Sequence, residues 1–137
     1  MKKALIISCL LLIVIGFATS CIDNKIESTE VKLVTAEEMQ SILELEDVQL
    51  VDVRTKEEYS LEHIANSQNI DFNSPTFDDD VSKLDKTKPV ILYCKGGTRS
   101  AKCAKKLKDA GFEKVYDLEG GISKWKHNDK IKIEVKS

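Results

Sequence analysis

The chain has few of the residues that commonly build a metal or nucleic-acid site. Its 137 residues include only two histidines, His63 and His127, without clustered carboxylates, which argues against a metal centre. Twenty-one basic and 23 acidic residues give a net charge of -2, so a general nucleic-acid binder is not expected. The sequence also lacks internal repeats and low-complexity segments. Its hydrophobic content of 42% and charged content of 32% instead fit one globular domain with a short appendage.

Cysteine is scarce as well, with four residues, and two of them lie in an N-terminal segment with the features of an export signal. Two lysines precede residues 4–18, an apolar run that has the length of a signal peptide core and is short for a membrane span. Residues 18–21, Ala-Thr-Ser-Cys, then resemble a bacterial lipobox, although alanine stands where leucine is usual. This pattern predicts cleavage before Cys21 and lipidation of that cysteine.

The export signal predicts how the chain is divided into segments and where in the cell the protein is located. We expect a signal peptide at 1–20, a flexible tether at 21–30 after lipidated Cys21, and the folded domain at 31–137. The protein would then be a membrane-anchored lipoprotein on the extracytoplasmic side of the cell envelope. Two alternatives stay open: ordinary secretory cleavage after Ser20, which would leave the cysteine free, and an uncleaved signal anchor.

Only Cys94 and Cys103 remain for the folded domain. Two cysteines in an exported protein suggest a disulfide. However, if residues 99–110 form a helix, Cys94 precedes its start and Cys103 lies more than one turn inside. Their Cα atoms should then be farther apart than the ~7 Å limit of a disulfide. We therefore predict two free thiols, with Cys103 packed in the core.

The rest of the chain alternates strand and helix patterns, which predicts an α/β fold with a central, mainly parallel sheet flanked by helices. Two capping boxes, at Thr35 and Thr55, mark helix starts, and Ser74-Pro75 marks a third. Residues 131–135 predict an edge strand or an unpaired tail. Strands are expected at 31–34, 49–53, 67–72, 89–94 and 114–118, with further helices at 99–110 and after Gly121.

The most informative stretch is the one around Cys94, which follows the most continuous apolar run and so the expected central strand. Gly96 and Gly97 let the backbone curl so that successive N–H groups point inward as an anion-binding nest. The following helix start adds partial positive charge, and Lys95 and Arg99 add full charges. All of these favour the thiolate form of Cys94, which is the nucleophilic form.

Residues 94–100, CKGGTRS, resemble the active-site loop of the rhodanese family of sulfurtransferases. The resemblance extends over residues 31–128, because other landmarks of that family follow in the same order. It implies a rhodanese-like three-layer fold. The landmarks are Asp52-Val53-Arg54, Glu57-Glu58-Tyr59, His63-Ile64, Asn69-Ile70, Gly111-Phe112 and Leu118 to Ile122 with Trp125.

The resemblance implies a double displacement in which Cys94 takes sulfur from a donor such as thiosulfate and passes it, as a persulfide, to a thiol or cyanide. The partners would be a small anionic sulfur donor, a thiol or cyanide acceptor and the membrane, for a monomer that needs no metal or organic cofactor. The substrate-binding residues would be Lys95, Gly96, Gly97, Thr98 and Arg99.

Alternative functions stay open for Cys94. Tyrosine-phosphatase-like loops also run from cysteine to arginine, but with five residues between them rather than the four found here. A non-enzymatic binding module would usually lack the cysteine. A thiol-redox or sulfur-sensing role would keep it.

The chain also departs from the family pattern in two places. Glu62 replaces a glycine, and Ala65-Asn66-Ser67 replaces Pro-Gly-Ala, where Asn66 tolerates a left-handed backbone. Asp52 and Arg54 are expected to be structural, as are His63 and Trp125.

Overall fold

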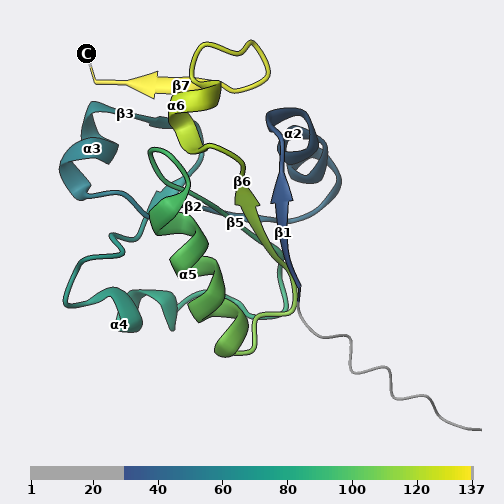
Figure 1. Ribbon diagram of the computed structural model, residues 1–137, viewed down its shortest axis with the longest axis vertical. Coiled ribbons are helices and arrows are strands. Elements are labelled where there is room, and N and C mark those ends of the chain that lie inside the picture. Colours follow the sequence, from purple (N-terminus) through teal and green to yellow (C-terminus); the bar gives the residue numbers. More distant parts are fainter. Residues whose placement is uncertain (1–29, 137) are drawn as a thin grey trace, which may run out of the picture.

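Five parallel strands form the central sheet of the computed structural model, which describes residues 30–136 (Figure 1). The strand order is β1-β6-β5-β2-β4, so β5 is the central strand, as its apolar sequence predicts. The predicted signal peptide and nearly all of the predicted tether lie outside the described residues. The strands are β1 (Val31–Val34), β2 (Gln49–Asp52), β4 (Gln68–Asn69), β5 (Val90–Tyr93) and β6 (Val115–Leu118).

Helices cover these strands, and two of them begin where capping boxes predict. Thr35 and Thr55 both form complete capping boxes, each with a glutamate three residues later. Gly111, with a φ of 88°, follows the helix that begins beside Cys94. The helices are α2 (Ala36–Leu45), α3 (Lys56–Leu61), α4 (Phe77–Val81), α5 (Thr98–Asp109) and α6 (Gly121–Trp125).

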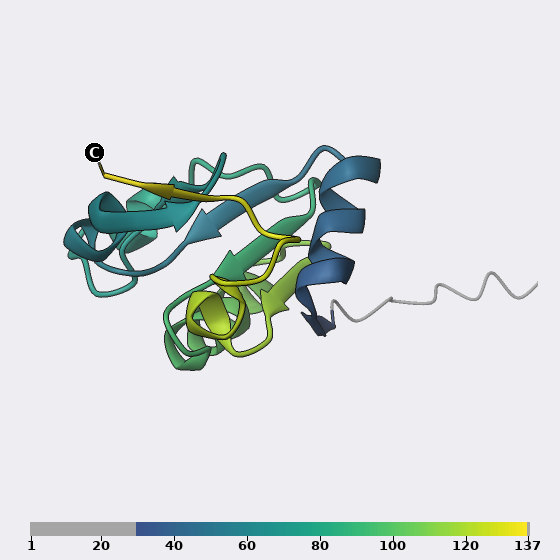
Figure 2. The same cartoon turned by 90° about the horizontal axis from the view of Figure 1, so that it is seen from above.

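Alternate residues of the strands divide the core into two layers, one on each face of the sheet. Val90 and Leu92 of β5 pack with buried residues of α4 and α5, whereas Ile91 and Tyr93 pack with those of α2 and α6. Figure 2 shows α2 and α5 apart, with the strands between them. The sheet is therefore covered on both faces, as a parallel sheet requires.

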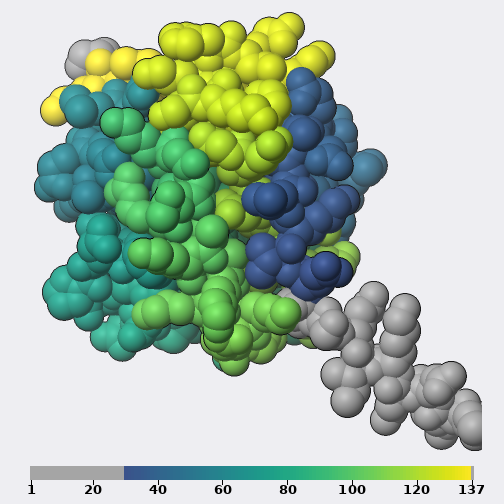
Figure 3. Space-filling view, viewed as in Figure 1, coloured from purple at the N-terminus to yellow at the C-terminus, as the bar shows by residue number. Residues whose placement is uncertain are grey.

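The C-terminal segment forms a second, two-stranded sheet. Strand β7 (Ile133–Val135) pairs antiparallel with β3 (Glu62–Ile64), so the segment is an edge strand and not an unpaired tail. Figure 3 shows the C-terminal residues, in yellow, packed across one end of the domain. This pairing fixes β3 next to the carboxyl ends of the main strands.

Two elements are shorter than their sequences predict. Strand β4 ends at Asn69, although the Ile70 and Phe72 N–H groups still donate to β2 and to Val53. The helix expected from Ser74 begins at Phe77, because the Ser74 hydroxyl accepts from the Thr76 N–H and holds the preceding residues in a turn.

Within residues 30–136, the helices are too short or too polar to span a bilayer.

Candidate active site

Cys94 lies at the carboxyl end of the central strand β5, where sites form in parallel α/β sheets. Its side chain is almost fully buried, with 1% of its surface exposed. The Gly97 N–H donates to Cys94 Sγ at 3.1 Å, and the Ser100 hydroxyl lies 3.5 Å from the same sulfur. The sulfur is thus held by donors from the loop and from the first turn of α5.

These donors favour the thiolate form. Burial alone would raise the pKa of the Cys94 thiol, but hydrogen bonds from the Ser100 side chain and from the backbone of Ser100, Gly97 and Gly96 outweigh it. The net effect is a lowered pKa, in the direction that the sequence predicts. The site can therefore present a nucleophilic sulfur and stabilise an anion on it.

The glycines of the loop have different roles. Gly97 has a φ of 103°, which an L side chain rarely adopts, and it precedes α5, so it turns the chain into the helix. A side chain on Gly96 would meet no other atom within 4 Å, so Gly96 faces open space. Thr98 begins α5 and is exposed. Of these two glycines, only Gly97 has a backbone conformation that requires glycine.

The start of helix α6 donates hydrogen bonds to the backbone of the cysteine loop. The Ile122 N–H donates to the Cys94 carbonyl at 2.9 Å, and the Ser123 N–H donates to the Lys95 carbonyl at 3.0 Å. Such close contact requires Gly121, because a Cβ there would lie 2.5 Å from the Cys94 oxygen. The Gly120-Gly121 pair therefore allows one helix start to fix the backbone of the cysteine loop.

The two cations of the loop differ in their surroundings. Arg99 forms a two-pronged ion pair with Glu58 of α3, with nitrogen–oxygen distances of 2.7 and 2.9 Å. This pairing holds the pKa of Glu58 at about 2. Lys95 is exposed and forms no ion pair with the residues that the structure describes. Lys95 is consequently the cation that is available to an incoming anion, whereas Arg99 braces the loop against α3.

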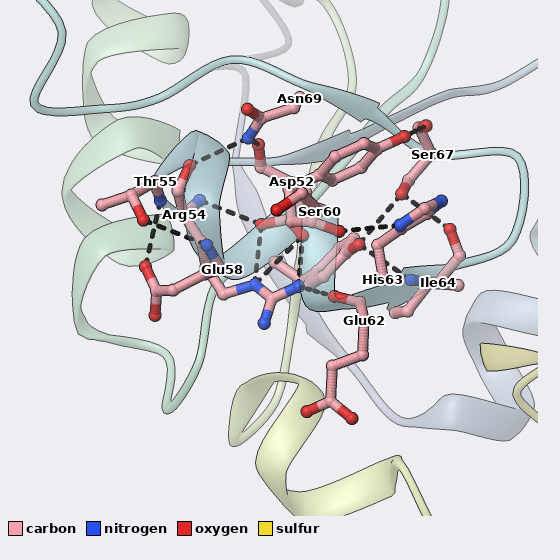
Figure 4. Close-up of polar contacts among 12 residues, drawn as sticks. Asp52, Arg54, Thr55, Glu58, Ser60, Glu62, His63, Ile64, Ser67 and Asn69 are labelled. Atoms are coloured by element: carbon pink, nitrogen blue, oxygen red, sulfur yellow. Dashed lines mark hydrogen bonds and ion pairs between the residues drawn. The ribbon is translucent and has the colours of Figure 1, made fainter. Parts of the chain in front are cut away.

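A second ion pair organises the edge of the site (Figure 4). The Asp52 carboxylate accepts from Arg54 Nε and from Arg54 Nη2, the latter at 2.7 Å, and both residues are buried. Arg54 Nη2 also donates to the Glu62 carbonyl, and Asn69 donates to the Asp52 and Arg54 carbonyls. These contacts fix the end of β2 to β3 and β4, which agrees with the structural role predicted for Asp52 and Arg54.

A pocket of about 320 Å³ opens next to the loop. Lys95 connects it with the cysteine loop, while α3, β3 and α6 form its walls. Glu62, which replaces the family's glycine, pairs with Lys126 across it at 3.2 Å. The lining residues are Arg54, Glu58, Leu61, Glu62, Lys95, Ile122, Ser123 and Lys126.

The remaining cysteine and the histidine that the sequence singles out contact core or surface residues and lie outside the Cys94 loop. Cys94 and Cys103 are free thiols, as predicted, and burial raises the pKa of Cys103 to about 12. His63 stacks on Tyr59 and contacts Glu134 at 3.0 Å. Among residues 30–136, no three His, Cys, Asp or Glu side chains are grouped in a way that could hold a metal ion.

Two further predictions concern local packing. Trp125 is half-buried against the core of the α2 face, and its indole N–H donates to the Glu119 carbonyl. Asn66 has a φ of 63°, so it does adopt the left-handed backbone that its sequence context allows.

Residues 95–99 form the turn and the helix start next to Cys94, and two further residues contact this loop, Glu58 and Ser100. Glu58 reaches the loop from a position 41 residues before Arg99, which no local pattern signals. Ser100 was visible as a hydroxyl residue in the first turn after the loop. That position could have been recognised as pointing back toward the sulfur.

These features define an α/β domain with a buried cysteine whose sulfur accepts hydrogen bonds from a loop and a helix start and whose pKa is lowered. Residues 35–128 match the family model of the rhodanese-like domain, and the chain belongs to that family. The fold comparison agrees. A rhodanese-like domain protein from Staphylococcus aureus aligns with a TM-score of 0.65 at 34% identity, over 78% of this chain and 100% of the other.

Two sequence relatives show the range of named functions among similar proteins. A protein named thiosulfate sulfurtransferase GlpE, from Coxiella burnetii, is 36% identical over 89 residues, which are 65% of this chain and 81% of the relative. A tRNA uridine(34) hydroxylase from Cytophaga hutchinsonii is also 36% identical, over 64% of this chain but only 29% of its own length. Sulfurtransferase activity is therefore supported at the level of the family.

Proposed function

We propose that the protein is a sulfurtransferase that carries sulfane sulfur as a persulfide on Cys94. The observation that carries this proposal is the pair of donors, the Gly97 N–H and the Ser100 hydroxyl, directed at a buried sulfur whose pKa is lowered. The similarity to a thiosulfate sulfurtransferase supports thiosulfate as a donor.

The first half-reaction loads the enzyme. The Cys94 thiolate attacks the outer sulfur of thiosulfate, a Sγ–S bond forms, and the bond to the sulfonate sulfur breaks. Its electron pair leaves with sulfite, so charge balances and no external oxidant is needed. The terminal sulfur of the persulfide is an anion, and the N–H groups of the loop are suited to hold it.

The second half-reaction unloads the sulfur. An acceptor thiolate or cyanide attacks the outer sulfur, and the electron pair of the broken bond returns to Cys94 Sγ. The Gly97 and Ser100 donors stabilise this leaving thiolate. The pocket beside Lys95 offers space for the rest of the donor or acceptor, and the exposed ammonium group favours an anionic one.

The decisive experiment measures the intact mass of the protein after treatment with thiosulfate and then with cyanide. We expect the wild type to gain one sulfur atom and to lose it to cyanide. Cys94→Ser should do neither, whereas Cys103→Ala, a matched change of the other buried thiol, should do both. Sulfur uptake by Cys94→Ser would overturn the mechanism. Hydrolysis of an aryl phosphate without sulfur uptake would favour a phosphatase instead, and reversible thiol oxidation alone would favour a redox role.

We also propose that the enzyme works at a membrane surface on the extracytoplasmic side. This part of the proposal rests on the N-terminal sequence, with its lysines, apolar run and lipobox-like residues 18–21. It places the acceptor among thiols or cyanide available outside the cytoplasm.

A further inference from the structure

The pocket beside the cysteine loop is lined by hydrogen-bond donors that no described residue uses. Arg54 is one of its lining residues, although only 3% of Arg54 is exposed. Two of its guanidinium nitrogens are occupied, because Nε and Nη2 donate to the Asp52 carboxylate and Nη2 also donates to the Glu62 carbonyl. The remaining nitrogen, Nη1, donates to no residue among 30–136, and Figure 4 shows it without a dashed contact.

Arg54 Nη1 is open to the pocket and not sealed in the core. Among the described residues, Asp117 Oδ1 is the single buried side-chain nitrogen or oxygen atom that lacks a hydrogen-bond partner. Nη1 therefore belongs to the small exposed part of Arg54, and that part faces the pocket that the residue lines. Because Asp52 holds the other side of the planar guanidinium, the N–H groups of Nη1 keep a fixed direction.

Lys126 supplies a second set of donors to the same pocket. It follows the last residue of α6, and its Nζ lies 3.2 Å from Glu62 Oε1. An ammonium group has three N–H donors, and this ion pair uses one of them, while Nζ has no other partner in the described part of the chain. Arg54 holds the backbone of Glu62 and Lys126 holds its carboxylate, so the two cations are neighbours at the pocket wall.

The charges that line the pocket leave one positive charge uncompensated. Four of its five charged residues have an ion-pair partner, and Lys95 has none among residues 30–136. A net charge of this size matches a monoanion such as a carboxylate better than a phosphate dianion. The pairs are Arg54 with Asp52, Glu58 with Arg99, and Glu62 with Lys126.

The size of the pocket favours the acceptor over the donor as its occupant. The sulfonate of thiosulfate is one bond away from the sulfur that Cys94 attacks, so it stays beside the loop and Lys95. The pocket has a volume of about 320 Å³, whereas a cavity of ~150 Å³ already holds benzene. It therefore has room for a thiol with a short carbon chain, whose far end reaches Arg54 and Lys126.

We propose that Arg54 Nη1 and Lys126 Nζ form a subsite for a carboxylate, and that the acceptor is a small thiol that carries this carboxylate at its far end. The inference rests on the proposed function of Cys94. The thiolate of the acceptor attacks the outer sulfur of the persulfide, and the electron pair of the broken bond returns to Cys94 Sγ. The carboxylate is chemically unchanged, so the subsite determines which thiols are used and takes no part in the bond changes.

The first test measures the selectivity of the loaded protein for two matched thiols. Full-length protein is loaded with thiosulfate, and its unloading by β-mercaptopropionate and by the corresponding amide is followed by intact mass. We expect Lys126→Gln to lower the carboxylate-to-amide rate ratio about fivefold and Glu62→Gln to raise it about threefold, because the latter removes a competing carboxylate. Lys124→Gln is the matched control, since Lys124 pairs with Glu119 on the same helix but does not line the pocket. It should keep the wild-type ratio.

A double variant separates direct contact from the general field of the pocket. Glu62→Gln combined with Lys126→Gln has the same net charge as the wild type but lacks the ammonium donors. Its rate ratio should be lower than that of the wild type, and a wild-type ratio would overturn the proposal. Arg54→Lys, which keeps a positive charge beside Asp52 but has no Nη1, should lower the ratio as well. If Lys126→Gln slowed loading by thiosulfate as much as unloading by the carboxylate thiol, the anion contact would belong to the donor and the acceptor assignment would be wrong.

A binding measurement on the wild type needs neither a buried substitution nor sulfur transfer. The probe is β-(methylthio)propionate, a thioether that cannot accept sulfur, and the signal is the NMR shift of the Arg54 Nε–H group. We expect a saturable shift with this probe and none with its amide. The absence of a shift with the carboxylate would overturn the subsite. Binding by a protein that takes up no sulfur would support the subsite but overturn the proposed function, whereas sulfur transfer without a carboxylate preference would overturn the subsite alone.

Discussion

Glu58 and Arg99 join the second capping box of the chain to its cysteine loop. Glu58 Oε2 accepts from the Thr55 N–H at 3.0 Å, which completes the N-terminus of α3, and from Arg99 at 2.7 Å. One carboxylate therefore contacts both the start of α3 and Arg99 of the cysteine loop. Because α3 also forms a wall of the pocket, the pair sets the position of that wall relative to Cys94.

The pair predicts a pH-dependent contribution to stability. The pKa of Glu58 falls from 4.5 to about 2 on folding, so its contribution is present above pH 4.5 and is lost as pH falls toward 2. We expect Glu58→Gln to reduce the free energy of unfolding by about 1 kcal/mol at pH 7, with allowance for solvent screening, and by less at pH 3. Urea unfolding at several pH values measures this. A pH-independent difference, or an equal effect of Glu57→Gln on the exposed side of the same helix, would contradict it.

Lys95 should govern the choice of donor. We expect Lys95→Ala to lower the kcat/KM for thiosulfate about 10-fold, because a charge-assisted contact with the anion is lost, and to affect an uncharged sulfur donor such as an organic trisulfide far less. Arg99→Ala should instead reduce turnover with every donor, since it releases the loop from Glu58. Steady-state kinetics with both donors distinguish the two, and Lys102→Ala in the exposed face of α5 is the control. Equal losses with both donors for Lys95→Ala would show that its charge does not select the donor.

Gly121 should be indispensable for the loop. Gly121→Ala would place a Cβ 2.5 Å from the Cys94 carbonyl oxygen and would strain a backbone with a φ of 62°. We expect a loss of about 1 to 3 kcal/mol in stability and a strong fall in sulfur uptake, measured by intact mass. Gly111→Ala is the matched control, because it has a φ of 88° but no atom within 4 Å of the new Cβ. It should lose stability and keep sulfur uptake. Normal uptake by Gly121→Ala would show that the loop tolerates displacement.

The predicted anchor can be tested by fractionation. We expect Cys21→Ser to leave the membrane fraction, because the residue that would be lipidated is gone. Cys9→Ser changes a cysteine within the apolar run without changing residues 18–21, and it should remain with the membrane. A wild type found in the soluble fraction, or a membrane-bound Cys21→Ser, would argue against lipidation.

Local signals account for what the sequence predicts well. Capping boxes depend on residues three positions apart, so Thr35 and Thr55 mark the starts of α2 and α3 correctly. The glycine turn around Gly97 and the apolar run of β5 are equally local, and they place Cys94 at a strand end beside a helix start. For this reason the position of Cys94 and the course of its loop can be predicted from the sequence, whereas the role of Cys94 as a nucleophile stays a prediction.

Contacts between distant segments account for what the sequence does not predict. Nothing near Arg99 indicates that Glu58 is its partner, and nothing near β3 indicates that β7 will pair with it. The burial of Asp117 in β6 follows from the packing of α5 on that strand, which the sequence of the strand does not indicate. Such features follow from topology, which local patterns do not determine.

The pairing of β3 with β7 joins the pocket wall to the last strand of the domain. The Cys94 loop needs only the residues up to Ser123, whose N–H caps the Lys95 carbonyl. The pocket wall at Leu61 is fixed by the Lys136 N–H and by the β7 strand before it. A chain that emerges from its amino-terminal end during synthesis therefore has every residue of the Cys94 loop and of its support in α6 available before β7, the strand that completes the pocket wall.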